Sequence, residues 1–221
     1  MSITLLDVYD RLLAHYGPQA WWPGDSRLEI MVGAILTQNT SWRNVEKAIL
    51  NLKEEGLFDP FKLQETPQEG LAEIIRPAGY YRLKAKRLQN LMRYVVETHH
   101  GDLDAMFACS LSALREDLLA LNGIGPETAD AILLYAGELP TFVVDTYTAR
   151  VLKRHGWIEQ EADYHQIQDL LVSELPQEVP LYNEYHALLV RVGNAHCRKT
   201  PKCDTCPLCE LLPPGGIEEG F

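Results

Sequence analysis

The sequence predicts an all-α protein, and two features of the chain support this fold class. Apolar residues recur at helical spacing over residues 88–95, 167–171 and 181–192, and residues 28–36 are apolar nearly all round, as in a fully buried helix. Glycine and proline residues gather at the connections, where they end helices: Pro60, Pro67, Gly101, Pro140, Pro176 and Pro180. The chain contains no convincing alternating strand pattern and no internal repeat.

Length and composition limit the class of protein. A chain of 221 residues with 46% hydrophobic residues forms one large domain or two small lobes with an ample core. No apolar run is long enough to cross a membrane, and the early acidic residues at the N-terminus do not form a secretory pattern. We therefore expect a cytoplasmic protein.

The segment 121–125, Leu-Asn-Gly-Ile-Gly, predicts a tight turn between two helices. Apolar positions at helical spacing lie on both sides of it, and Pro126 suits the first turn of the second helix, where its missing N–H costs nothing. Gly123 and Gly125 permit backbone angles and close approaches that a side chain would block. The free amides of the second helix can bind a phosphate group. Farther along, Asp145 follows a short apolar run, which places its carboxylate at the rim of a core.

Four segments together carry a family resemblance: the hairpin with Asp145, ILTQNTSW (35–42), AGYYRLKA (78–85) and the cysteine-rich segment 197–209. In this order they resemble the endonuclease III (helix-hairpin-helix-GPD) superfamily of DNA glycosylases. The resemblance implies two lobes facing each other across a cleft. The central lobe would be residues 28–139, with the helix–hairpin–helix at about 111–136, and the second lobe residues 1–27 with 140–221, holding Asp145 and the cysteine loop. It also implies a monomer, associated with the nucleoid, whose partner is double-stranded DNA with a damaged base.

The formal net charge of −11 is unusual for a DNA-binding protein, but the basic residues are clustered. Three clusters fall in or beside the segments of the resemblance: Arg82, Lys84, Lys86 and Arg87; Arg150, Lys153 and Arg154; and Arg198, Lys199 and Lys202. These clusters form either ordinary solvated helix faces or one basic, DNA-facing side. We expect the second arrangement, with weak binding that depends strongly on salt.

Within these segments we expect seven residues to contact DNA: Gln38, Tyr80, Arg82, Lys84, Gly123, Gly125 and Arg150. By resemblance, Gln38 fills the gap left by a flipped nucleotide, and Tyr80 wedges beside the partner base. Alternatively, Gln38 caps a helix and Tyr80 is a half-buried surface residue.

Asp145 is the expected catalytic residue. Hydrolysis of an N-glycosidic bond passes through an oxocarbenium-like sugar, which a carboxylate stabilises while it orients or deprotonates water. The alternative role of Asp145 is a helix N-cap. Family members that also cleave the strand carry a lysine where this chain has Glu127, and a carboxylate cannot form an imine. The resemblance therefore implies a monofunctional glycosylase without AP lyase activity, in which Glu127 either stabilises its helix or takes a direct part in catalysis.

Four cysteines, Cys197, Cys203, Cys206 and Cys209, are separated by five, two and two residues. We expect them to hold a [4Fe–4S] cluster, and a structural zinc ion is the alternative. The usual spacing in the family is six, two and five residues, so the last two cysteines stand closer here. Either metal would have a structural role and present a basic loop to DNA. The remaining cysteine, Cys109, is expected to be a buried apolar side chain.

Tryptophan residues indicate the substrate. Trp21, Trp22 and Pro23 precede the buried helix, and Trp42 ends the segment ILTQNTSW. In these residues and in Gly-x-Glu at the hairpin, the chain resembles the bacterial 3-methyladenine DNA glycosylase branch, whose members can lack the metal cluster. Indoles stack well on a cationic methylated purine, although core packing would also explain them. The alternatives are a glycosylase for damaged or mismatched pyrimidine, like endonuclease III, and a non-catalytic protein that binds DNA structures.

Overall fold

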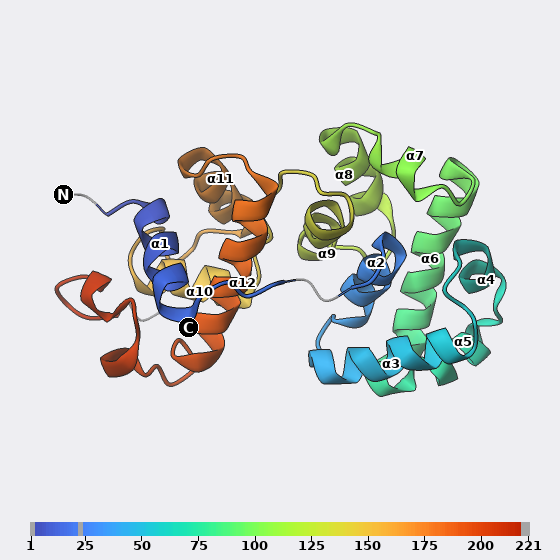
Figure 1. Ribbon diagram of the computed structural model, residues 1–221, viewed down its shortest axis with the longest axis horizontal. Helices are drawn as coiled ribbons and strands as arrows, with labels where there is room; N and C mark the ends of the chain where they lie inside the picture. Colours follow the sequence, from blue (N-terminus) through green and yellow to red (C-terminus); the bar gives the residue numbers. More distant parts are fainter. Residues whose placement is uncertain (1–2, 22–23, 218–221) are drawn as a thin grey trace. The chain divides into compact units, whose positions relative to one another are not determined.

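The computed structural model describes residues 3–21 and 24–217, and every regular element within these ranges is a helix. The predicted all-α fold class is therefore confirmed. The chain forms two compact units (Figure 1): unit 1 comprises residues 1–21 and 140–221, and unit 2 comprises residues 22–139. In the described ranges, none of the helices is both long and apolar enough to span a membrane.

Unit 2 is built around the long helix α6. Its elements are α2 (Arg27–Leu36), α3 (Trp42–Glu54), α4 (Pro60–Glu65), α5 (Gln68–Ile74), the 3-10 helix η1 (Arg76–Ala78), α6 (Tyr81–His99), α7 (Leu103–Phe107), α8 (Leu111–Ala120), α9 (Pro126–Ala131) and the π-helix η2 (Ile132–Ala136). Helices α4, α5 and α7 pack against α6 (Figure 1), and α2 packs against both α6 and η2. Most of α2 is buried, as its apolar sequence predicted.

The segment before α2 is tied to unit 2 by polar contacts. The Oγ of Ser26 accepts a hydrogen bond from the backbone N of Glu29 at 3.2 Å and so caps the helix. The Nζ of Lys53 lies 2.9 Å from Oδ2 of Asp25 and 2.8 Å from Oε2 of Glu29. These contacts join residues 25–29 to unit 2, which comprises residues 22–139, whereas the sequence predicted residues 28–139.

The helix–hairpin–helix lies in unit 2 and consists of α8, a turn over residues 121–125, and α9, which continues into η2. Gly123 has a φ of +99°, and a Cβ atom there would lie 2.3 Å from Cγ of Arg87. Both the backbone angle and the available space therefore require glycine. Arg115 of α8 and Asp130 of α9 form a two-pronged ion pair with N···O distances of 2.8 and 3.0 Å, which joins the two helices.

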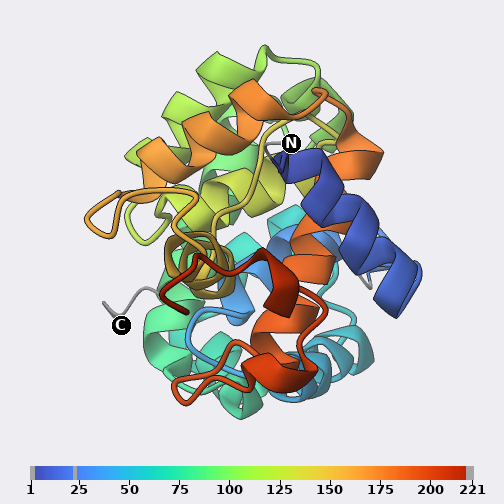
Figure 2. The ribbon, with the colours of Figure 1, turned by 90° about the vertical axis from the view of Figure 1, so that its left-hand side faces the viewer.

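Unit 1 combines both ends of the chain. Its elements are α1 (Leu5–Tyr16), α10 (Thr146–Arg154), α11 (Tyr164–Glu174), α12 (Val179–Ala195) and the 3-10 helices η3 (Cys203–Thr205) and η4 (Cys209–Leu211). Helix α1, blue in Figures 1 and 2, packs against α12, in orange. The hydroxyl of Tyr185 on α12 donates to the carbonyl oxygen of Leu5 on α1 at 2.9 Å. The Tyr185 ring also packs edge-on against Phe142, so distant parts of the sequence share one core.

Helices α10 and α12 cross closely at Gly193. A Cβ atom at this residue would lie 2.6 Å from Cδ1 of Tyr147, the second residue of α10. The absence of a side chain therefore lets α12 pack directly against the start of α10, where Asp145 is located.

Candidate functional site

A network of hydrogen bonds around Gln38 joins three segments of unit 2. Gln38 lies in the loop between α2 and α3. Its Nε2 donates to the carbonyl oxygen of Gly123 at 3.1 Å and to Oγ1 of Thr128 at 3.0 Å, while its Oε1 accepts from Nη1 of Arg87. The segment ILTQNTSW is thus connected to the hairpin and to α6. The cap residue of α3 is Ser41, so the helix-cap alternative for Gln38 is wrong.

Lys84 is buried beside this network, which corrects the expectation that it contacts DNA. Only 1% of the residue is exposed. Its Nζ donates to the carbonyl oxygens of Leu36 and Ala78, each at 2.8 Å, so it links the end of α2 to the end of η1. Burial, together with the nearby charge of Arg87, lowers the pKa of Lys84 to about 8. Clustering in the sequence concealed this role, because neighbouring helical residues point to different faces.

Tyr80 and Arg82 are exposed at the start of α6. Tyr80 has a left-handed backbone conformation with a φ of +45°, and 72% of the residue is exposed, which argues against the half-buried alternative. Backbone strain of this kind costs of order 1–3 kcal/mol and is common at functional sites. The Arg82 side chain is 71% exposed, with its Nε 3.9 Å from Oε2 of Glu69. An exposed ring beside an exposed guanidinium can contact the bases and phosphates of a nucleic acid.

The start of α9 presents backbone amides and a carboxylate. Gly125 is the exposed N-cap residue of this helix, and Pro126 is its first residue. Glu127 is exposed in the first turn, where a negative charge stabilises the N-terminal end of a helix. This position supports the structural role considered for Glu127.

Asp145 caps α10 with one of its two carboxylate oxygens. Its Oδ1 accepts from the backbone N of Thr148 at 2.7 Å, so Asp145 is a helix N-cap. Its Oδ2 lies 3.7 Å from Nε2 of His186, and 13% of the Asp145 side chain is exposed. The cap orients the carboxylate through Oδ1 alone. Capping and a catalytic role are therefore compatible.

His186 of α12 is the residue of this site that the sequence analysis missed. It is 4% exposed. Burial lowers the pKa of the imidazole, and the Asp145 carboxylate opposes this shift by a smaller amount. The neutral ring is therefore favoured at neutral pH. A single histidine in the apolar pattern of 181–192 gave no sign of its neighbour, because the contact depends on how α10 and α12 cross.

Two of the three basic residues of α10, Arg150 and Arg154, are directed toward the cysteine segment. Arg150, expected to contact DNA, donates from Nη1 to the carbonyl oxygen of Cys197 at 3.0 Å. Arg154 is only 4% exposed, and its Nη1 lies 3.4 Å from Sγ of Cys197 and 2.6 Å from the carbonyl oxygen of Arg198. The expectation that Arg154 belongs to a DNA-facing surface is therefore wrong. In contrast, the basic residues of the third cluster are exposed: Arg198, Lys199 and Lys202.

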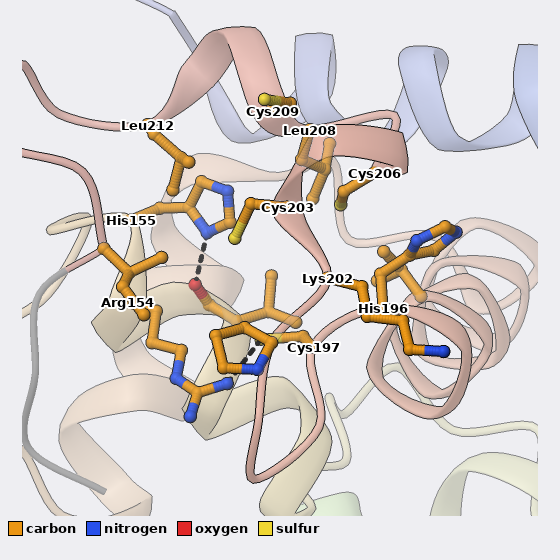
Figure 3. A pocket seen from close by; sticks show the side chains of 14 residues that line it. Arg154, His155, His196, Cys197, Lys202, Cys203, Cys206, Leu208, Cys209 and Leu212 are labelled. Atoms are coloured by element: carbon orange, nitrogen blue, oxygen red, sulfur yellow. Dashed lines mark hydrogen bonds between the residues drawn. The ribbon is translucent and has the colours of Figure 1, made fainter.

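The four C-terminal cysteines line one pocket of unit 1 (Figure 3). The pocket measures about 330 Å³, including space open to solvent, and Arg154 and His155 also line it. None of these four cysteines forms a disulfide bond. Burial raises the pKa of the Cys203 and Cys206 thiols, and the neighbouring cysteines raise it further. Within the described ranges, no three cysteine, histidine, aspartate or glutamate side chains are close enough to share a metal ion.

The chemistry of these donors nevertheless suits a metal–thiolate centre. The four thiols line one pocket, and Sγ of Cys197 lies 3.4 Å from the buried guanidinium of Arg154, whose positive charge can balance a deprotonated sulfur ligand. Cys109 is separate from this group. It is exposed after α7, so the expectation that it is buried is wrong.

The tryptophans are divided between the two units. Trp21 is the last residue of the N-terminal part of unit 1, whereas Trp42 begins α3 in unit 2. The Nε1 of Trp42 donates to Oε1 of Glu46 at 3.0 Å, and the side chain is partly exposed. Trp22 and Pro23 lie outside the described residues. The base pocket formed by these four residues stays a prediction.

Comparison with known proteins shows which class this architecture defines. The family model of the HhH-GPD superfamily base excision DNA repair proteins matches residues 32–177. A protein of Methanocaldococcus jannaschii, provisionally named a DNA repair glycosylase, is 48% identical over 206 residues, covering 92% of this chain and 93% of that protein. Endonuclease III of Bacillus subtilis is 30% identical over 173 residues, covering 76% and 74%.

Solved structures agree with this class at the level of the fold. A trapped endonuclease III–DNA covalent intermediate has a TM-score of 0.80 at 24% identity, covering 95% of this chain and 96% of that one. The 3-methyladenine DNA glycosylase of H. pylori, bound to 1,N6-ethenoadenine, has a TM-score of 0.76 at 29% identity, covering 87% and 98%. The chain belongs to the HhH-GPD superfamily of base excision DNA repair proteins, and the resemblance found in the sequence is confirmed.

Proposed function

We propose that the protein is a monofunctional DNA N-glycosylase that releases an alkylated purine, such as 3-methyladenine, by hydrolysis. The observation that carries this proposal is the position of Asp145. Its carboxylate is oriented by the 2.7 Å hydrogen bond from Thr148 and is still partly exposed. An oriented carboxylate is the group that hydrolysis of an N-glycosidic bond requires.

The reaction follows from the charge of the substrate. Methylation of a ring nitrogen makes the base cationic, so the bond between C1′ and the base nitrogen breaks with its electron pair going to the base, which leaves neutral. Asp145 stabilises the positive charge that develops on the sugar. Water then adds to C1′ and loses one proton, which is transferred either to Asp145 or directly to solvent. The product is an abasic site on an intact strand.

The choice of substrate is supported by the predicted aromatic pocket. The extruded base would be enclosed by Trp21, Trp22, Pro23 and Trp42. The attraction between an indole ring and a cationic base contributes about 0.5–2 kcal/mol to binding, and a neutral pyrimidine gains less. The similarity to the H. pylori 3-methyladenine DNA glycosylase is consistent with this choice.

The cysteine pocket would hold a [4Fe–4S] cluster through Cys197, Cys203, Cys206 and Cys209, with zinc as the alternative. The cluster would supply structural cross-links and no step of the hydrolysis. Arg150 and Arg154 would fix the segment against α10 through their bonds to the cysteine loop. The exposed residues Arg198, Lys199 and Lys202 would then face DNA phosphates.

A second candidate is a glycosylase for damaged or mismatched pyrimidine, favoured by the 30% identity to a protein named endonuclease III. Base release from duplexes that carry one lesion each distinguishes the two. We expect 3-methyladenine to be released faster than uracil, thymine glycol or mismatched thymine, and Trp42→Ala to reduce this activity far more than affinity for undamaged duplex. Efficient release of a pyrimidine without release of 3-methyladenine would establish the second candidate. No release of any base would indicate a non-catalytic DNA-structure binder.

A further inference from the structure

A buried histidine faces the second oxygen of the Asp145 carboxylate. Nε2 of His186 lies 3.7 Å from Oδ2 of Asp145, and 6% of the His186 side chain is exposed. The opposite oxygen, Oδ1, is held by the backbone N of Thr148 at 2.7 Å. Each carboxylate oxygen therefore has its own neighbour, one from α10 and one from α12.

The fold gives this contact a fixed geometry. Gly193 brings α12 against Tyr147, two residues after Asp145. Helix α12 also packs against α1. Because α12 packs against both α10 and α1, the imidazole is presented to the carboxylate by packed helices and not by a loop.

We propose that His186 is a positioning residue for Asp145: its Nε2–H donates to Oδ2 and holds the carboxylate in one orientation during hydrolysis. This inference rests on the catalytic role of Asp145 in the proposed function. The distance of 3.7 Å is longer than an ordinary N–H···O hydrogen bond, so the two side chains must approach by about 0.5–1 Å when substrate is bound.

A neutral donor suits this place better than a cationic one. The sugar gains positive charge in the transition state, and a second cation beside Asp145 would oppose it. Burial favours the neutral imidazole, in agreement with its lowered pKa. A neutral N–H keeps the carboxylate oriented without cancelling its charge.

Two substitutions separate positioning from packing. In His186→Gln the amide Nε2 replaces the imidazole donor, whereas His186→Leu fills the space without a donor. Tyr185→Phe is the matched control, because it removes a buried hydrogen bond from the adjacent residue of α12, on the side facing α1. The measurements are the single-turnover rate of base release and the Kd for a duplex with an abasic-site analogue. Urea unfolding checks that each variant is folded.

We expect His186→Leu to slow base release about 30- to 100-fold with Kd changed less than about threefold. His186→Gln should recover the rate to within about fivefold of the unmodified protein, and Tyr185→Phe should leave it unchanged. Equal slowing in the Gln and Leu variants, or a normal rate in His186→Leu, would overturn the inference. If His186→Leu is fully active while Asp145→Asn is inactive, only this inference fails. If Asp145→Asn is fully active, both the proposed mechanism and this inference fail.

The protonation site of His186 can also be measured in the unmodified protein, so this test does not depend on whether the variants fold. Nitrogen NMR of the labelled histidine distinguishes the two neutral tautomers. The proton should be on Nε2 of His186. A proton on Nδ1 alone would contradict the proposed hydrogen bond.

Discussion

The side-chain Nε2 of Gln38 donates a hydrogen bond to the carbonyl oxygen of Gly123 at 3.1 Å. This bond fastens the loop after α2 to the turn of the helix–hairpin–helix. A second bond from the same nitrogen to Oγ1 of Thr128 and one from Arg87 to Oε1 complete the connection. Gln38, whose side chain is expected to enter the DNA, therefore also supports the hairpin when no DNA is bound.

This connection predicts that Gln38→Ala weakens binding to undamaged duplex as well as to abasic-site DNA. The substitution removes three hydrogen bonds, and two of them, to Gly123 and Thr128, fasten the hairpin that we expect to hold a phosphate. Each contributes about 1 kcal/mol, so we expect Kd to rise about five- to tenfold for both duplexes. Gln89→Ala is the matched control. Its amide also donates to two carbonyl oxygens, of Gln64 and Thr66, but not at the hairpin. A loss confined to abasic-site DNA would instead support gap filling alone.

Lys84 predicts a dependence of stability on pH. Its pKa is lowered to about 8 in the folded chain from an ordinary value of 10.5. Between about pH 8 and pH 10.5 the folded state binds fewer protons at Lys84 than the unfolded state does, so the free energy of unfolding rises with pH over this range. The stability gained in this way is lost again as the pH falls through 8. Lys84→Met leaves two carbonyl oxygens without this donor and should lower stability by about 2–3 kcal/mol.

Urea unfolding at pH 7 and pH 9.5 tests both statements. The difference in the free energy of unfolding between the unmodified protein and Lys84→Met should be larger at pH 9.5. The exposed Lys86, two residues along α6, provides the control Lys86→Met, which should show no such change. A difference independent of pH would show that Lys84 keeps its ordinary pKa.

The cysteine pocket predicts a brown protein. Purified anaerobically, it should contain about four irons per chain and absorb in the thiolate-to-iron charge-transfer region. Cys203→Ser should lower the iron content and weaken DNA binding together, because the basic loop loses its cross-links. Cys109→Ser, which changes an exposed cysteine outside the pocket, should do neither. Colourless protein with stoichiometric zinc would select the alternative metal.

Glu127 predicts the absence of AP lyase activity. A carboxylate cannot form an imine with C1′, so the enzyme should leave an intact abasic strand and give no adduct when borohydride is added during turnover. An endonuclease III of the kind solved as a trapped covalent intermediate with DNA serves as the positive control and should give an adduct under the same conditions. A trapped adduct would reveal a nucleophilic lysine elsewhere in the chain.

Periodicity predicted the helices of this protein well, because the burial of α2 and the capping of α10 depend on local sequence. The family resemblance suggested a DNA contact for Tyr80, which needs an exposed ring, and the ring is exposed. Lys84 and Arg154 were misassigned because both were interpreted by their charge. Each is instead buried by tertiary packing and bonded to carbonyl oxygens. His186 could not be found from spacing, since its contact with Asp145 arises from the crossing of two helices.

The most direct test of the central claim is the single-turnover rate of 3-methyladenine release by Asp145→Asn. Asparagine can still cap α10 through its side-chain oxygen, so the variant keeps the fold while removing the charge. We expect the rate to fall by at least about 1,000-fold with affinity for lesion DNA nearly unchanged. A rate within about tenfold of that of the unmodified protein would contradict the account, because the carboxylate would then not stabilise the transition state.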